Sequence, residues 1–268
     1  CIRDSTGEVP FVRYSIDKAH ETAAASGARI VHSCGFDSIP SDLGVYALYQ
    51  KISDDDAGQL TDTTLVMRAM RGGLSGGTID SMRVLAEQAK DSQIRRLMLN
   101  PQSLSGGPGE VPKASLSSEP SDLNIVSAKK VDPSLRGTLA PFFMAGHNTR
   151  IVRRSNVLLD NAYGPDFHYA ETMNVGSIPA VSTITAGAVG VGTGAFLGAM
   201  SFGPTRRLLD RVLPKPGSGP SEKARDNGYF VSEGYTRTTT GRRFRAQMRA
   251  QGDPGYKATA VMLGESAL

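Results

Sequence analysis

Short strand patterns and helix patterns alternate along the first third of the chain, and this alternation constrains the fold more than any other feature. RIVHSC (29–34) has the pattern of a short buried strand, and IPSDLGVYALYQKI (39–52) follows with a helical pattern. Ser and Asp near the start of that helix are residue types whose oxygens cap free N–H groups. TDTTLVMRAM (61–70) predicts the next strand and GTIDSMRVLAEQAK (77–90) the next helix. Such alternation is typical of an α/β layer.

Patterns elsewhere in the chain predict further elements of both kinds. SIDKAHETAAASG (15–27) predicts a helix that ends at Gly27, and FHYAETMNV (167–175) predicts a strand. Residues 101–124 hold four Pro and three Gly, which favours a long loop. RRFRAQMRAQ (242–251) alternates between apolar and polar residues and predicts one half of a hairpin.

Bulk composition narrows the class of protein. The 268 residues are 39% hydrophobic, enough for one large domain or two modest ones, and the start at Cys1 in a polar run suggests a fragment. Two cysteines provide neither a disulfide framework nor metal-ligand spacing, so we expect a reducing cytosol and no metal site. Residues 206–250 hold eleven Lys/Arg against four Asp/Glu, which favours an anionic surface, nucleotide or lipid headgroup over nucleic acid.

A glycine-rich segment without charge allows three interpretations. GVGTGA (190–195) fits the G-x-G-x-x-G/A dinucleotide fingerprint, but the preceding STITAGA is a poor strand. The same segment has glycine every fourth residue at 190, 194 and 198, which favours close helix packing in a soluble core or in lipid. Residues 172–205 carry no charge, and a basic stretch follows, so peripheral contact with a membrane is the third interpretation.

Two short motifs indicate nucleophiles. GLSGG (73–77) matches the G-x-S-x-G elbow, with Ser75 as nucleophile and His147 and His168 downstream. The alternative is a strand-to-helix turn whose backbone N–H groups bind an anion. His32 and Cys34 share one face of a strand, but no third group is assignable, so Cys34 is as well explained as a small apolar strand-end residue.

Six motifs follow one another along nearly the whole chain: STGE (5–8), HSCGFDSIPSDLG (32–44), RGGLSGGTIDSM (71–82), NTRIVRRSN (148–156), LPKPGSGPSEKARDNGYF (213–230) and GDPGYKATAVMLGESAL (252–268). Together they resemble the saccharopine dehydrogenase-like oxidoreductases, and within them most closely the branch that contains the trans-acting enoyl reductases of bacterial polyketide-lipid synthesis. The resemblance implies an α/β fold: an α+β substrate domain with a mixed sheet, plus the remnant of a Rossmann-type domain that lacks its glycine fingerprint.

The resemblance also implies domain bounds. Residues 1–50 would be the C-terminal remnant of the Rossmann domain, and residues 51–252 the substrate domain, which includes the apolar segment 178–203. Residues 253–268 would begin a helix that returns to the Rossmann domain. Without the fingerprint, we expect the chain alone to bind nucleotide poorly and to be inactive.

Roles for the CGFD turn follow from the same resemblance. This turn would pass the nicotinamide end of NADPH or NADH, where Gly35 allows close approach and Phe36 packs on the ring or ribose. Asp37 would accept a hydrogen bond from cofactor or substrate, and Asp37 and Cys34 are the catalytic candidates. The proton donor stays open between Tyr14, Cys34 and water.

Further residues are implied to surround the substrate. Thr6 and Glu8 would face it, Gly76 and Gly77 would close over it, and Thr78 would also contact the cofactor. Contacts from the helical NTRIVRRSN motif would come from Asn148 and Arg150, the latter to a carboxylate, a thioester oxygen or a phosphopantetheine phosphate.

The sequence therefore predicts an NAD(P)H-dependent oxidoreductase that reduces a C=C bond of a lipid or polyketide intermediate. The charge-free segment and its basic flank fit a lipid better than the small, highly charged saccharopine. The alternatives are a saccharopine-type amino-acid enzyme, a serine hydrolase on Ser75 and a membrane-associated scaffold without catalysis. Expected partners are a small-molecule or acyl-thioester substrate and a membrane surface at the inner face of the plasma membrane, with a homodimer left open.

Overall fold

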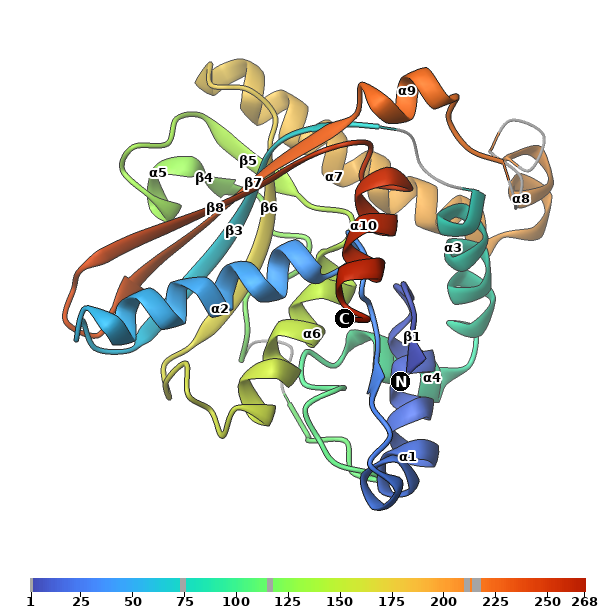
Figure 1. Ribbon diagram of the computed structural model, residues 1–268. Coiled ribbons are helices and arrows are strands. Elements are labelled where there is room, and N and C mark those ends of the chain that lie inside the picture. Colours follow the sequence, from blue (N-terminus) through green and yellow to red (C-terminus); the bar gives the residue numbers. More distant parts are fainter. Residues whose placement is uncertain (1, 73–75, 115–117, 210–212, 214–217) are drawn as a thin grey trace.

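A mixed six-stranded sheet forms the centre of the computed structural model, which describes residues 2–72, 76–114, 118–209, 213 and 218–268. Across the sheet the strands run in the order β4 (Val126–Ser127), β5 (Thr138–Pro141), β6 (His168–Asn174), β3 (Leu60–Arg71), β7 (Tyr229–Thr238) and β8 (Arg243–Gln251) (Figure 1). β3 and β6 pair in parallel, and the other neighbours pair antiparallel. The predicted mixed α/β architecture is therefore confirmed.

The predicted hairpin is present as β7 and β8. Tyr229 pairs with Gln251 at one end of the hairpin and Arg237 with Arg243 at the other. Phe244, Ala246 and Met248 pack against the core, whereas the alternate side chains of β8 are exposed. The period-two pattern thus identified both the strand and its buried face.

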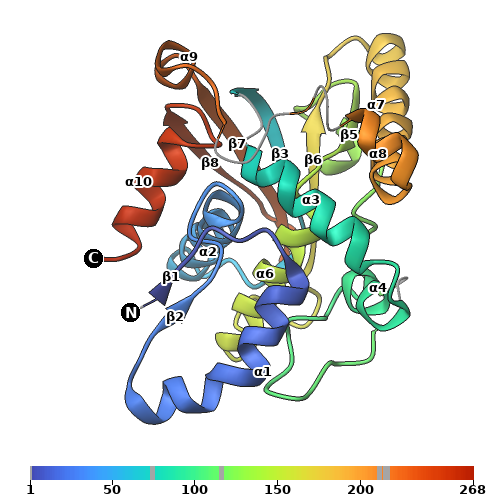
Figure 2. The same cartoon turned by 90° about the vertical axis from the view of Figure 1, so that its right-hand side faces the viewer.

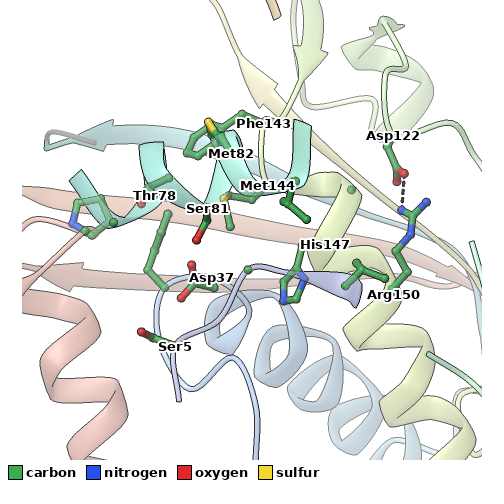
Figure 3. A pocket seen from close by; sticks show the side chains of 18 of the residues that line it. Ser5, Asp37, Thr78, Ser81, Met82, Asp122, Phe143, Met144, His147 and Arg150 are labelled. Carbon is green, nitrogen blue, oxygen red and sulfur yellow. Dashed lines mark hydrogen bonds and ion pairs between the residues drawn. The ribbon is translucent and has the colours of Figure 1, made fainter. Parts of the chain in front are cut away.

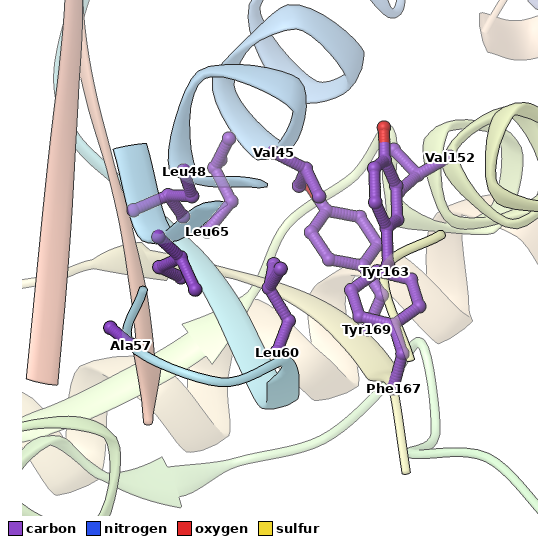
Figure 4. Packing of buried hydrophobic residues seen from close by; sticks show 10 residues of the cluster. Val45, Leu48, Ala57, Leu60, Leu65, Val152, Tyr163, Phe167 and Tyr169 are labelled. Carbon is purple, nitrogen blue, oxygen red and sulfur yellow. The ribbon is translucent and has the colours of Figure 1, made fainter. Parts of the chain in front are cut away.

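One face of the sheet is covered by α2 (Ile39–Asp54) and α6 (Ala145–Leu158), as Figure 1 shows. The core beneath them combines aliphatic side chains of α2 and β3 with aromatic side chains around β6 (Figure 4). Along β3, Leu65 packs into this core, whereas Val66 packs into a second cluster on the opposite face. Successive strand residues point to opposite faces, so a single strand contributes to both cores.

Ser38 is the N-cap residue of α2, but its side chain makes no capping hydrogen bond. The hydroxyl of Ser38 donates instead to Asn148 Oδ1 at 3.1 Å, so a tertiary contact takes the place of the local cap.

The N-terminal residues form a small β-α-β unit. β1 (Ile2–Arg3) and β2 (Ile30–Val31) pair in parallel, and α1 (Val9–Ser26) connects them. α1 ends where predicted, with Gly27 at a φ of 70° that favours glycine. α10 (Lys257–Glu265) returns to this unit, and Arg3 Nε donates to the carbonyl of Ser266 at 2.6 Å. The chain thus brings its two ends together, while the proposed domain bounds stay a prediction.

The remaining helices are α3 (Gly76–Gln88), α4 (Ser92–Leu99), α5 (Ala128–Val131), α7 (Pro179–Ser201), α8 (Gly203–Leu209) and α9 (Glu222–Asp226). α7 lies on the side of the sheet opposite α2, as Figures 1 and 2 agree. GVGTGA (190–195) lies inside α7 rather than at a strand-to-helix turn, so it does not form a phosphate-binding loop.

The long loop between α4 and β4 is held by buried arginines. Arg13 of α1 donates to the carbonyls of Gly106 and Gly107, and Arg153 of α6 donates to that of Pro101. Because each guanidinium satisfies backbone carbonyls, the loop keeps a defined path without a helix or strand in its described residues.

Candidate active site

A cavity of about 630 Å³ lies between the N-terminal unit, α3, α6 and α10. Its wall is largely apolar, formed by Val9, Phe36, Met70, Met82, Leu85, Met98, Leu99, Leu123, Phe143 and Met144. The polar side chains that line it are Ser5, Asp37, Thr78, Ser81, Asp122, His147, Arg150 and Thr259 (Figure 3). The close-up shows Asp37 near Ser5 and Ser81, with Arg150 and Asp122 farther along the wall.

The position of the cavity follows from the two parallel strands. Ser5 and Gly7 come directly after the carboxyl end of β1, and Phe36 and Asp37 come after that of β2. The carboxyl ends of parallel strands meet at one edge of a sheet, where open α/β sheets bind their ligands. The sequence-predicted turns STGE and CGFD therefore do meet at one crevice.

Asp37 is the acidic side chain at this end of the cavity. Burial is the largest cause that raises the pKa of its carboxyl group, and with the smaller contribution of the nearby Asp4 carboxylate the pKa reaches about 6. A carboxyl group with a pKa near neutrality can hold or release a proton at physiological pH.

Gly35 lies where α10 meets the CGFD turn. A Cβ atom at Gly35 would lie 2.7 Å from Thr259 Cγ2 and 3.0 Å from Asp37 Oδ2. Thr259 Oγ1 also accepts a hydrogen bond of 2.9 Å from the backbone N–H of Phe36. The backbone at Gly35 therefore lies directly against Thr259 of α10. This contact holds in place the turn that carries Asp37.

We expect Gly35→Ala to lower the free energy of unfolding by about 1–3 kcal/mol, because the added methyl group has no space beside Thr259. Chemical denaturation would measure the loss, and Thr259→Ser in the same chain should restore part of it. Gly264→Ala is the matched control, since a Cβ there meets nothing within 4 Å. Equal effects of the two alanine variants would contradict the packing argument.

Cys34 lies beside the cavity rather than on its wall. Its side chain is fully buried, and Sγ contacts the carbonyl of Val31 at 3.4 Å. Burial raises the pKa of the Cys34 thiol. A buried thiol of raised pKa is a poor nucleophile and a structural residue of the strand end.

Thr6 and Glu8 shape the first turn through hydrogen bonds. Thr6 Oγ1 accepts from the backbone N–H of Glu8 at 3.2 Å, and Glu8 Oε1 accepts from Ser81 Oγ at 2.6 Å. Ser81 lines the cavity whereas Thr6 and Glu8 do not. Glu8 therefore ties the STGE turn to α3.

The residues beyond residue 50 that the resemblance predicts to contact substrate or cofactor divide into two groups. Gly77, Thr78 and Arg150 line the cavity; Gly76 and Asn148 do not. Gly76 donates its N–H to the carbonyl of Ser218 at 3.2 Å. Ser75 and the start of the GLSGG motif lie outside the described residues.

Arg150 and Asn148 are both engaged with protein groups. The guanidinium of Arg150 forms an ion pair with Asp122 and donates to the carbonyl of Met98 at 3.1 Å. The amide of Asn148 donates to Glu171 Oε2 at 2.9 Å. The positive charge of Arg150 is thus already balanced at the cavity wall.

His147 is a cavity residue for which sequence reasoning found no role in this crevice. Its Nε2 lies 2.8 Å from Ser33 Oγ, and Ser33 donates its own proton to the carbonyl of Thr6. Nε2 must therefore be the protonated nitrogen. Burial, together with the charge of Arg150, lowers the pKa of His147 to about 4, so the ring is neutral at physiological pH. The sequence signal that could have identified His147 is its position directly before the NTRIVRRSN motif.

A Ser-His-Asp arrangement exists in the N-terminal unit, away from the GLSGG motif. His32 Nδ1 lies 2.5 Å from Asp4 Oδ2, and His32 Nε2 lies 2.9 Å from Ser15 Oγ. These contacts connect β1, α1 and β2, and neither Ser15 nor His32 lines the cavity. Because these contacts join three elements of the N-terminal unit, we interpret the network as structural.

Fold and cavity together define an α/β protein with a largely apolar cavity at the carboxyl ends of two parallel strands. The chain is 51% identical over 269 residues to a Mycobacterium tuberculosis protein named "Putative trans-acting enoyl reductase Rv2449c". It is 43% identical to proteins named trans-acting enoyl reductase from Mycobacterium bovis and Mycobacterium ulcerans. Each match covers 99% of this chain and 64% of the relative. The similarity to trans-acting enoyl reductases predicted from the sequence is thereby confirmed.

No family model matches the chain, and no solved structure matches it.

Proposed function

We propose that the chain is part of an NAD(P)H-dependent enoyl reductase that reduces a C=C bond of a lipid or polyketide intermediate presented as an acyl thioester. The observation that carries this proposal is the apolar cavity with an acidic group of raised pKa at one end. Its support from other proteins is the similarity to the named reductases over nearly the whole chain.

The cavity wall favours an acyl chain over a small charged substrate. Four methionines line it, Met70, Met82, Met98 and Met144. Methionine side chains are flexible and adapt to apolar ligands of varied shape. A substrate such as saccharopine would need unpaired charges, whereas the guanidinium of Arg150 is balanced by Asp122.

The turns after β1 and β2 fit the nicotinamide end of a dinucleotide. Ser5 and Gly7 offer a small polar surface, and Phe36 offers an aromatic ring beside Asp37. The parallel pairing of β1 and β2 through α1 is what the end of a Rossmann domain would provide, in keeping with the saccharopine dehydrogenase-like resemblance. Bound NAD(P)H would supply a hydride to the β-carbon of the enoyl group.

Asp37 supplies the matching proton in this proposal. Reduction of the conjugated bond leaves negative charge at the α-carbon and thioester oxygen, and a proton must reach the α-carbon. The protonated carboxyl group of Asp37 donates it and is left as a carboxylate. Cys34 has a buried thiol, and Tyr14 is exposed and does not line the cavity, so Asp37 is better placed than either.

The decisive experiment is NADPH or NADH oxidation by the purified full-length protein of which this chain is part, with enoyl thioesters of several chain lengths. Turnover that rises with acyl length supports the proposal. Turnover of saccharopine in place of enoyl thioesters would reassign the protein to amino-acid metabolism. Labelling of Ser75 by a fluorophosphonate, without reductase activity, would support the hydrolase alternative. Binding of NAD(P)H without any turnover would favour the non-catalytic scaffold.

The proposal places the protein in the cytoplasm, where NAD(P)H and acyl-thioester intermediates are available to it. The proposed reaction does not require a homodimer, and sedimentation of the purified protein would measure its oligomeric state.

A further inference from the structure

The outward face of α7 is apolar, which is the reverse of an ordinary surface helix. Ile184 and Val191 are 74% and 75% exposed, and Ile178 and Val181 are exposed as well. Within the described residues, Pro179–Met200 is long and apolar enough to cross a membrane by length and composition, and 12% of its most apolar window is buried. A helix that is apolar all round is normally covered by a core or by lipid.

α7 packs on the protein through its small residues. Ser182 and Ala186 are fully buried, and Ser182 Oγ accepts a 2.9 Å hydrogen bond from the backbone N–H of Thr138 on β5. A Cβ at Gly194 or Gly198 would meet nothing within 4 Å. A Cβ at Gly190 would meet Ile125 Cδ1 at 3.4 Å, so within the described residues the glycine pattern makes a close contact at Gly190 but not at Gly194 or Gly198. Because one face is bound to the sheet, α7 lies along the protein rather than crossing a bilayer alone.

Exposed arginines occupy the same side of the sheet. The alternation of β8 directs Phe244, Ala246 and Met248 to the core under α2, so Arg243 and Arg249 point to the opposite side, where α7 lies (Figure 2). Neither arginine makes an ion pair with a residue that the structure describes. β8 is four strands from β5, roughly 20 Å at the usual strand spacing.

We infer that α7, together with the arginines of β8, docks the protein on an anionic membrane surface. Apolar side chains of α7 enter the boundary between headgroups and acyl chains, and Arg243 and Arg249 contact anionic headgroups. A second copy of the chain explains the apolar face of α7 but not the arginines of β8, which form no ion pair with a described residue. The inference goes beyond the proposed reaction and does not depend on it.

α3 connects this surface to the cavity. It contacts α7 on one side and contributes Thr78, Ser81, Met82 and Leu85 to the cavity wall on the other. A docked α7 would hold α3 near the bilayer, so an apolar substrate would have a short path from lipid to the cavity.

Flotation of the protein with vesicles tests this inference. We expect binding to vesicles of phosphatidylcholine with phosphatidylglycerol and much weaker binding to phosphatidylcholine alone. Ile184→Asp with Val191→Asp should lower the bound fraction at least tenfold, because two charges enter the apolar face. Arg243→Gln with Arg249→Gln should weaken binding to anionic vesicles about fivefold per arginine.

Leu158→Asp with Val261→Asp is the matched control. Both residues are about as exposed, at 62% and 60%, and belong to α6 and α10, which lie away from α7. A wild-type protein that does not float, or equal losses in the control and the α7 variant, would overturn the inference. So would sedimentation showing a wild-type dimer that the α7 variant converts to a monomer without any vesicle binding, because the face would then be a self-association surface.

Discussion

Asp37→Asn in the full-length protein is expected to lower kcat for enoyl reduction by about 10²- to 10⁴-fold, the usual contribution of a positioned acid. The amide keeps the size of the carboxyl group but cannot deliver its proton to the α-carbon. In the wild-type protein, the acid must be protonated, and burial places its pKa at about 6. The rate should therefore be highest below pH 6 and fall as pH rises through 6, and the variant should lose this limb of the profile.

The control for this prediction is Asp54→Asn, on the exposed end of α2, which should keep both the rate and the pH profile. NADPH binding, measured by fluorescence, separates a loss of chemistry from a loss of cofactor. Unchanged kcat in Asp37→Asn would remove Asp37 from the reaction. Weaker NADPH binding with unchanged kcat would make it a cofactor contact only.

Periodic sequence patterns identified the elements that position this site. The alternation in RRFRAQMRAQ gave β8 and its buried face, and Gly27 gave the end of α1, because both signals are local. The meeting of the STGE and CGFD turns came from the family resemblance, and the parallel pairing of β1 and β2 explains it.

Long-range partners could not be predicted in the same way. The pairing of Arg150 with Asp122, and the contact of Ser33 with His147, join residues 28 and 114 positions apart. No local period encodes such contacts, so Arg150 was expected to meet substrate and His147 was not connected to the crevice. Likewise, a stretch of small residues is compatible with close packing on either face, and the tertiary structure decides which face of α7 is covered.

The buried carboxyl group of Glu171 is expected to make the free energy of unfolding depend on pH. Glu171 on β6 is 2% exposed, accepts hydrogen bonds from Tyr169 at 2.8 Å and Asn148 at 2.9 Å, and lies under α2 and α6. Burial is the largest cause that raises its pKa, to about 7, from the ordinary value of 4.5. The folded state therefore holds a proton that the unfolded state releases at lower pH.

We expect Glu171→Gln to remove a pH-dependent part of the stability. Between pH 4.5 and 7 the folded state binds more protons at this site, so its contribution is fully present below pH 4.5 and is lost as pH rises to 7. A shift of this size corresponds to roughly 3 kcal/mol. Urea denaturation from pH 4.5 to 8 should show the wild-type protein losing this amount relative to the glutamine variant.

Glu222→Gln, an exposed control on α9, should follow the wild type. Parallel pH curves for wild type and Glu171→Gln would mean that Glu171 does not titrate in this range, so the stability at neutral pH would not depend on it.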